Sequence, residues 1–426
     1  MTELRRLPEG LVNRIAAGEV VERPAAAVKE LVENAVDANA RQIVITLHDG
    51  GKTLISVADD GHGMTAEELP LAVTRHVTSK LQGDDLTEIR WLGFRGEALP
   101  AIGAVSRLTV TSREIGADQA WMLEVEGGVS RLVVPAAFGS GTLIKVRDLF
   151  FATPARLKFM KTSRAEAMAI TDVVNQLAMA RPDITFTLKS DDRTRLHYDA
   201  AQGELMEARL NRLAEIMGRD FADNAITLET ERDDVRLTGY ASLPTLNRGN
   251  ARLQFLFVNG RPVRDKLIFG ALRAAYNDLL ARDRHPLAAL FVDLHPSSVD
   301  VNVHPAKAEV RFREPGMVRG LIVGALRHGL NAVGHRASTT VSQAALGAMQ
   351  REAPGTFFAA PGAPNVSHQK GSGASEVSQG ALMPTASPVA INEEIREGDV
   401  SDSFPLGAAR GQLHDTYIVA QTADGL

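Results

Sequence analysis

The sequence predicts an α+β protein with two folded units, in which helices cover one face of a mixed sheet. Three observations support this prediction. The chain has 426 residues, which is more than a single domain usually holds. Segments with helical and with strand periodicity are interspersed from residue 24 to residue 312. From residue 337 to residue 408, Pro, Gly, Ser and Ala dominate with little periodicity, which predicts a flexible linker.

A helix is predicted from about Pro24 to Ala38, because proline suits a first turn and "DANA" supplies a stop. Its apolar residues recur at helical spacing and form a core-facing stripe: Val28, Leu31, Val32, Ala35 and Val36. The opposite side carries oxygen-bearing side chains at the same spacing: Glu30, Glu33, Asn34 and Asp37. This side is either an ordinary solvated surface or a row of oxygens, short of cationic partners, for a hard cation or a polarised water.

A hairpin should follow the helix, with strands at Ile43–Leu47 and Leu54–Val57 joined by the turn Asp49-Gly50-Gly51. Thr65 and Glu68 then have the spacing of a capping box, which predicts the start of another helix. The remaining elements predicted for the first unit are strands at 108–111, 121–125 and 142–146 and a long helix at 164–180.

The second unit should begin near Leu228, and we place the first domain at residues 1–222 and the second at 223–336. Its predicted strands lie in "VRLTGYAS", "LQFLFVNGRPV" and "LAALFVDL", with Asn259-Gly260 as a hairpin turn. The segment "DKLIFGALRAAYNDLL" has a helical period. Residues 409–426 look like a strand that opens a further, truncated domain.

Composition excludes several classes of protein. The absence of cysteine excludes disulfides and thiolate metal sites and favours a reducing cytoplasm. No apolar run reaches the length of a membrane span, so a protein without membrane association is expected. Because the net charge is −5, nucleic acid could be bound only through local basic patches. The candidate patches are "RDLFFATPARLKFMK" and "NGRPVRDK".

Glycine-bearing loops are the candidates for ligand binding. "GGKT" at residues 50–53 is not a Walker loop, because Thr46 stands where that loop needs glycine. In "DDGHGM", a carboxylate ends a strand and two glycines let a flat ligand approach, although the same pattern also makes plain turns. "LGFRGEAL" precedes a helix, so its backbone N–H groups and Arg95 are suited to phosphate oxygens. Between these loops, Lys80 of "HVTSK" is either a further ligand-binding residue or an ordinary surface lysine.

The order of these pieces resembles the nucleotide fold shared by gyrase, heat-shock chaperones, histidine kinases and MutL. The longer strings "IAAGEVVERP", "LGFRGEAL", "FVNGRPVRD" and "VDVNVHPAKAEVRF" resemble the MutL mismatch-repair family over residues 7–312. The resemblance implies a GHKL (Bergerat) ATPase α/β sandwich followed by a ribosomal protein S5-like transducer domain. One departure is Asn39, which stands where glycine is usual but tolerates a left-handed cap.

The resemblance also implies roles for individual residues. Glu30 would be the general base for the attacking water, and Asn34 would bind Mg²⁺ on the phosphates. Lys307, in the second domain, would reach the γ-phosphate of ATP. Asp59 would accept the adenine amino group. The other ATP-binding residues implied are Gly61, Gly63, Thr78, Ser79, Lys80, Gly93, Arg95, Gly96 and Thr142. Glu33 and Asp37 are left as structural or solvating.

The function implied is a slow, Mg²⁺-dependent ATPase that dimerises through its N-terminal domains and couples mismatch recognition to strand incision or removal. Implied partners are the mismatch-recognition protein MutS, a downstream nuclease or helicase, a second copy of the chain, and DNA. DNA would be bound without sequence preference by Arg156, Lys158, Arg261 and Arg264. The expected location is the bacterial cytosol, near the nucleoid. Two alternatives stay open: the ATPase subunit of a type II topoisomerase-like enzyme, and a scaffold that binds nucleotide without hydrolysis.

Overall fold

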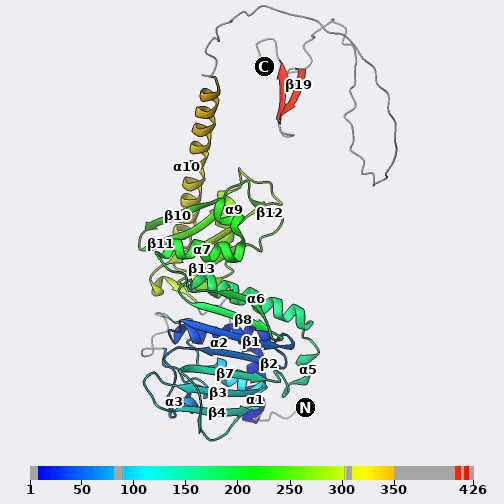
Figure 1. Ribbon diagram of the computed structural model, residues 1–426, viewed down its shortest axis with the longest axis vertical. Coiled ribbons are helices and arrows are strands. Elements are labelled where there is room, and N and C mark those ends of the chain that lie inside the picture. The colour runs from blue at the N-terminus through cyan, green and yellow to red at the C-terminus, as the bar shows by residue number, and fades with distance from the viewer. Residues whose placement is uncertain are drawn as a thin grey trace, which may run out of the picture. The chain divides into compact units, whose positions relative to one another are not determined.

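The computed structural model describes residues 8–80, 89, 91–301, 303, 309–349, 408–413 and 417–421. Contacts group the chain into two units, residues 1–352 and residues 353–426. Among its described residues, the first unit contains a nine-stranded and a five-stranded sheet with their helices, and two short two-stranded pairs (Figure 1). The second contains the antiparallel hairpin β19 (Ala408–Leu413) and β20 (Tyr417–Gln421).

The larger sheet has nine strands in the order β5-β4-β3-β7-β2-β1-β8-β9, with β6 paired to β4. Only β1 and β8 run parallel among these pairs, so the sheet is mixed as predicted. The strands are β1 (Gln42–His48), β2 (Leu54–Asp59), β3 (Arg107–Arg113), β4 (Ala120–Glu126), β5 (Val129–Ser130), β6 (Val134–Ala136), β7 (Gly141–Arg147), β8 (Thr185–Ser190) and β9 (Arg193–Tyr198).

Helices pack on this sheet and share one core with it. They are α1 (Glu9–Val20), α2 (Pro24–Asp37), α3 (Glu68–Ala72), α4 (Ala98–Val105), α5 (Pro154–Leu157) and α6 (Ser163–Ala180), with a 3-10 turn η1 (Asp49–Gly51). Buried and less buried residues alternate along β1 and β2, because successive side chains of a strand point to opposite faces. The apolar stripe predicted on α2 is buried throughout.

The smaller sheet has the order β10-β11-β16-β13-β14. Its strands are β10 (Ala225–Arg232), β11 (Val235–Ser242), β13 (Gln254–Val258), β14 (Arg261–Val263) and β16 (Ala288–Asp293). Around it lie α7 (Leu205–Met217), α8 (Arg219–Asp223), α9 (Lys266–Ala275), α10 (Pro315–Met349) and η2 (Pro296–Ser298), with the short pairs β12 (Asn247–Arg248) with β15 (His285–Pro286) and β17 (Val299–Asp300) with β18 (Arg311–Phe312).

Both faces of the smaller sheet are covered, and one helix joins the two sheets. Residues of α9 and α10 form one core with it, while α7, α8 and the last turn of α6 form another. The earlier turns of α6 belong to the core of the larger sheet. Thus α6 packs against both sheets, and its side chains tie their cores together.

Local predictions agree well with these elements. Thr65 and Glu68 exchange the two hydrogen bonds of a capping box, at 2.9 and 3.3 Å. Asn39 takes a φ of 59°, the left-handed conformation expected after α2. One prediction was wrong: helix α10 continues to Met349, so the segment from residue 337 to residue 349 is helical rather than linker. This segment contains four Ala and no Pro, and alanine is the residue with the highest helix propensity.

Candidate functional site

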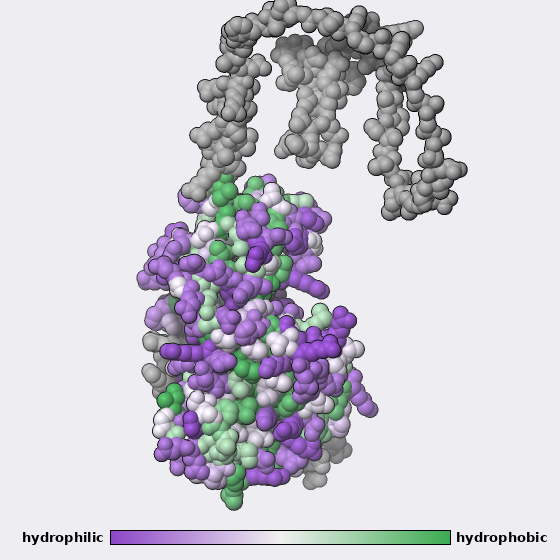
Figure 2. Space-filling view, in the orientation of Figure 1, coloured by the Kyte–Doolittle hydropathy of each residue, from purple (hydrophilic) through white to green (hydrophobic). Residues whose placement is uncertain are grey.

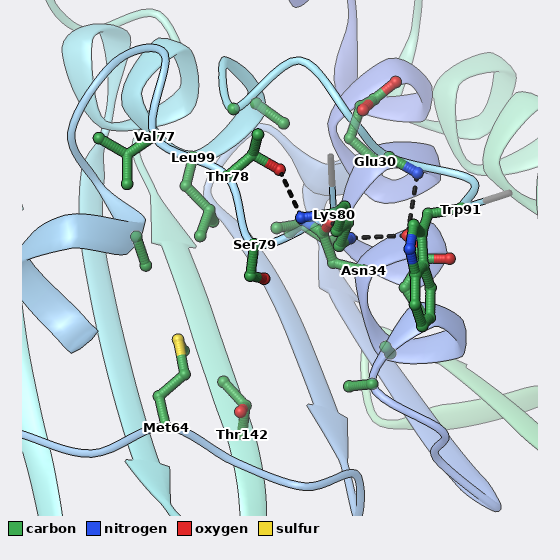
Figure 3. A pocket seen from close by; sticks show the side chains of 18 of the residues that line it. Glu30, Asn34, Met64, Val77, Thr78, Ser79, Lys80, Trp91, Leu99 and Thr142 are labelled. Carbon is green, nitrogen blue, oxygen red and sulfur yellow. Dashed lines mark hydrogen bonds and ion pairs between the residues drawn. The ribbon is translucent and has the colours of Figure 1, made fainter. Parts of the chain in front are cut away.

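A cavity of about 450 Å³ lies between α2, the ends of β2 and β7, and two loops at residues 77–80 and 91–97 (Figure 3). Side chains predicted at separate points of the sequence meet here. Those that line it are Glu30, Asn34, Asp59, Gly63, Thr78, Ser79, Lys80, Gly93, Arg95, Gly96 and Thr142. Gly61 lies beside it, within contact of Asp59 and Ala38.

Asp59 ends β2 and is paired in register with Thr142 of β7. Its side chain is 8% exposed, and its carboxylate accepts a 2.9 Å hydrogen bond from the N–H of Gly61. Burial raises the pKa of Asp59 to about 6, and the backbone hydrogen bonds only partly oppose that shift. A carboxylate held at such cost in a cavity is a strong acceptor for a donor on a ligand.

Glycine is required next to this carboxylate. Gly63 has a φ of +73°, and a Cβ there would lie 2.1 Å from the carbonyl oxygen of Arg113. A Cβ on Gly61 would lie 2.7 Å from Ala38. Larger residues at either position would therefore push the loop into the cavity, which explains why the motif needs both glycines.

Glu30 and Asn34 lie one turn apart on α2 and both face the cavity (Figure 3). Both are partly exposed, so water and ligand atoms can reach them. The side-chain oxygen of Asn34 accepts a 2.8 Å hydrogen bond from the ammonium of Lys80. Lys80 is therefore not an ordinary surface lysine, which was the alternative interpretation of that residue.

Asp37 has a structural role that the sequence left undecided. It is 8% exposed and binds the ammonium of Lys80 at 2.6 Å and the N–H groups of Leu92 and Gly93 at 2.9 Å each. Glu33 is 0% exposed and lies 3.4 Å from Lys29. Of the two interpretations left open for Glu33 and Asp37, structural or solvating, the buried positions favour the structural one. The view that this row of oxygens is short of cationic partners was wrong, because Lys80 binds it. Lys80 comes from a distant loop, and sequence spacing on the helix could not reveal it.

The loop glycines Gly93 and Gly96 bring backbone close to the cavity. Gly96 has a φ of +61°, and a Cβ there would lie 2.4 Å from the carbonyl oxygen of Val77. A Cβ on Gly93 would lie 3.1 Å from Asn34 and 3.2 Å from Lys80. The two loops consequently pack against each other and against α2, next to the start of α4. Backbone N–H groups, Lys80 and Arg95 at this end suit an anionic group.

The four basic residues predicted to bind DNA do not lie in equivalent environments. Lys158 and Arg264 are exposed, and Arg156 is partly exposed with one bond to the carbonyl oxygen of Val21. Arg261 is 3% exposed, and its guanidinium donates to backbone carbonyls of the 91–97 loop. Because its guanidinium is buried and bonded, Arg261 is not available to DNA in this structure. The prediction failed here because a basic stretch of sequence does not reveal burial or tertiary contacts. Lys307 lies outside the described residues.

The residues present fit a nucleotide with an associated cation. The glycines at 61, 63 and 96 let backbone segments around the cavity pack more closely than a Cβ would allow, and a Cβ on Gly93 would crowd Asn34 and Lys80. The cavity lining contains the buried carboxylate of Asp59 and the cationic groups of Lys80 and Arg95. Asn34 supplies an amide oxygen of the kind that Mg²⁺ accepts. Among the described residues, none of the helices has the length and apolar character needed to cross a bilayer.

Comparisons with known proteins agree on a family. Residues 22–130 match the family described as "Histidine kinase-, DNA gyrase B-, and HSP90-like ATPase". Residues 213–331 match the family described as "DNA mismatch repair protein, C-terminal domain".

Curated relatives and solved structures point the same way. The chain is 55% identical to the DNA mismatch repair protein MutL of Rhodospirillum rubrum, over 99% of this chain and 73% of that protein. It is 57% identical to the MutL of Paramagnetospirillum magneticum, over 99% and 72%. A structure titled "Crystal Structure of N terminal domain of a DNA repair protein" matches with a TM-score of 0.62 at 25% identity, covering 75% of this chain and 98% of that one. The Aquifex aeolicus MutL ATPase domain complexed with ADP matches with a TM-score of 0.51 at 26% identity, covering 71% and 98%.

Proposed function

The chain belongs to the MutL family of DNA mismatch repair proteins and carries a GHKL-type ATPase domain, and we propose that ATP bound in the α2 cavity drives a conformational switch in repair. The observation that carries this proposal is the convergence of Asp59, Glu30 and Lys80 on one cavity. The ADP complex of the Aquifex aeolicus relative supports a nucleotide there.

In this proposal the adenine amino group donates to the buried carboxylate of Asp59, next to Gly61, Gly63 and Thr142. The phosphates lie toward Lys80, Arg95 and the N–H groups of the 91–97 loop, where donors and positive charge collect. Thr78, Ser79, Gly93 and Gly96 shape that end of the cavity. The ligand is thus oriented by one carboxylate at the base and by cations at the phosphates.

Glu30 serves as the general base in this arrangement. It lies one turn before Asn34 on the same side of α2 and is partly exposed, so it can hold a water and accept its proton. Asn34 would hold Mg²⁺, which, when bound, supplies positive charge to the phosphate oxygens. A carboxylate placed for proton transfer argues for hydrolysis and against a scaffold that only binds nucleotide.

The switch itself extends the proposal to the second domain. Lys307 reaches the γ-phosphate, so ATP, but not ADP, fixes the angle between the two domains and promotes N-terminal dimerisation. The domains proposed are residues 1–222 and 223–336, followed by a linker that begins after helix α10 ends at Met349 and by a C-terminal segment at residues 409–426. The proposed partners are DNA, MutS, a downstream nuclease or helicase and a second copy, in the bacterial cytosol.

The topoisomerase alternative is set aside, because the relatives match 99% of the chain and are mismatch repair proteins.

The test compares nucleotides on the whole chain. With Mg²⁺, a non-hydrolysable ATP analogue should raise the mass measured by light scattering toward that of a dimer, while ADP should leave it unchanged. Lys307→Ala should abolish the difference and keep ADP affinity within a few-fold, because ADP lacks the γ-phosphate. Equal masses with analogue and ADP in the wild type would refute the switch, and absence of ADP binding would refute the site.

A further inference from the structure

The backbone of residues 91–93 is hydrogen-bonded by two charged side chains, one from strand β14 of the smaller sheet and one from helix α2 on the larger sheet. Arg261 begins β14 of the smaller sheet, and its guanidinium donates 3.0 Å hydrogen bonds to the carbonyl oxygens of Trp91 and Leu92. Asp37 ends α2, which packs on the larger sheet, and accepts from the N–H groups of Leu92 and Gly93 at 2.9 Å. The peptide between them therefore depends on both domains for its position.

The next residue anchors the same loop in the smaller sheet's core. Phe94 is 3% exposed and packs in the cluster that contains Leu256, Val258 and residues of α9 and α10. Ile89 packs against that cluster as well. Arg95, one residue on, returns to the cavity and lies over the Phe94 ring at 5.7 Å. Within four residues the chain passes from the core of one domain to the nucleotide site of the other.

Arg261 suits this position for chemical reasons. Its planar guanidinium presents several N–H groups in a fixed fork, so it can hold two successive carbonyls, whereas a lysine ammonium offers a single centre. Burial lowers the pKa of Arg261, and carboxylates of α2 oppose that shift. These carboxylates belong to Glu33, Glu30 and Asp37. A charge from the smaller sheet thus lies within the field of the helix that carries the proposed base.

We propose that Arg261 and Phe94 are positioning residues through which the second domain sets the conformation of the nucleotide loop. Arg261 holds the carbonyls of Trp91 and Leu92, and Phe94 anchors the loop in the core of the smaller sheet. The position of the loop in turn determines whether the N–H groups of Leu92 and Gly93 can bind Asp37. The relation works in both directions, so a nucleotide that moves the loop also displaces β14. This inference rests on the proposed nucleotide site but assigns Arg261 to coupling rather than to DNA.

Trp91 provides a direct probe of the loop. It is 39% exposed, and Trp121 is the only other tryptophan of the chain. In the Trp121→Phe background, Arg261→Gln should at least about double the collisional quenching of Trp91, because a released loop opens its indole to solvent. Hydrogen exchange of the peptide covering residues 91–94 should accelerate by about tenfold in the same variant without nucleotide. Arg261→Lys should give intermediate values, since it keeps the charge and loses the fork.

Arg209→Met is the matched control. Arg209 is also buried, donates from α7 to Thr238 at 2.8 Å and lies over the Phe291 ring at 4.0 Å. Within the part of the chain that the structure describes, Arg209 makes no hydrogen bond to the 91–97 loop and lies outside the cavity lining, so quenching of Trp91 and loop exchange should stay at wild-type values. If Arg209→Met changed them as much as Arg261→Gln, the effect would be general loosening and the proposal would be overturned.

A second readout separates positioning from binding. Arg261→Gln should lower the turnover of ATP by about tenfold or more while KM changes little, because adenine contacts at Asp59 are untouched. If Arg261→Gln did not fold, the Trp91 quenching of Arg261→Lys would decide the matter alone. Wild-type quenching and exchange in folded Arg261 variants that bind ADP would overturn this inference and leave the proposed function intact. Failure of the wild type to bind ADP would instead overturn the proposed function.

Discussion

The ammonium of Lys80 donates to the side-chain oxygen of Asn34 at 2.8 Å, the same oxygen that we propose for Mg²⁺. Lys80 also binds Asp37 at 2.6 Å, with its own side chain 22% exposed and that of Asp37 5% exposed. One internal cation therefore neutralises this part of α2, and Mg²⁺ and Lys80 have to share or exchange the Asn34 oxygen. Lys80 therefore contributes both to the stability of the ligand-free protein and to its affinity for nucleotide.

The first prediction follows from that pair. Lys80→Met removes the ammonium that binds Asp37 and leaves that carboxylate with two backbone donors. The free energy of unfolding of the ligand-free protein in urea should therefore fall by about 1 to 3 kcal/mol. Lys189→Met, at an exposed position of β8, should change stability by less than about 0.5 kcal/mol. In a double-mutant cycle, Asp37→Asn and Lys80→Met together should cost less than the sum of the two. A strictly additive cycle would show that the ion pair contributes nothing.

Glu30 gives the second prediction. A general base acts on the attacking water and barely touches the bound nucleotide, so Glu30→Ala should reduce ATP turnover at least about a hundredfold. Affinity for ATP, measured by calorimetry, should stay within a few-fold of the wild type. Lys29→Ala, the neighbouring change on α2, removes no group with a proposed chemical role. Turnover in Glu30→Ala at the wild-type rate would exclude it as the base.

Asp59 gives the third prediction, on binding. Without its charged acceptor, the adenine amino group loses a hydrogen bond to a charged partner, which is worth about 1.5 to 3 kcal/mol. Asp59→Asn should therefore weaken ATP and ADP by the same factor, whereas changes near the phosphates should affect them unequally. Titration calorimetry with both nucleotides checks this. Unchanged affinity for both would place the base pocket elsewhere.

The fourth prediction concerns the stability of the same variant: Asp59→Asn should weaken nucleotide binding but stabilise the ligand-free fold. Because the pKa of Asp59 is raised from 3.8 to about 6 in the fold, ionising it above pH 6 opposes folding. A shift of that size corresponds to about 3 kcal/mol. Ligand-free Asp59→Asn should thus unfold at higher urea than the wild type at pH 7.5, and the gap should shrink between pH 6 and pH 4. A gap that stays constant over this range would mean that burial does not shift the carboxyl.

DNA binding is the subject of the fifth prediction. Lys158 and Arg264 are exposed, and if they contact phosphates, Lys158→Gln and Arg264→Gln should each lower the salt dependence of binding by about one ion. The loss should be equal on unrelated DNA sequences, because phosphate contacts carry no sequence information. Fluorescence anisotropy at several salt concentrations measures both quantities. Arg261→Gln should leave the salt dependence of DNA binding unchanged. A lower salt dependence in this variant would mean that Arg261 contacts DNA after all.

The elements could be predicted from the sequence because their signals are local, whereas the residues of the nucleotide site were predicted from the resemblance of separate motifs to a family. The stripe on α2, the capping box at Thr65 and the left-handed Asn39 depend on neighbours within one or two turns. The contacts of Lys80 with Asp37 and of Arg261 with Leu92 join residues 43 and 169 positions apart. No periodicity reports such pairs, and a buried arginine has the same sequence signature as one that binds DNA.

The parallel pairing of β1 with β8 bears on how the chain folds during synthesis. Gln42 pairs with Thr185, roughly 140 residues later, while β2 is available to β1 almost at once. A ribosome adding about 5 to 20 residues per second therefore leaves the β1 edge unpaired for on the order of ten seconds. An unpaired strand edge is a template for pairing with other chains. We expect nascent chains halted before β8 to depend on chaperones and to aggregate when released, and chains extended beyond β9 to be largely free of this hazard.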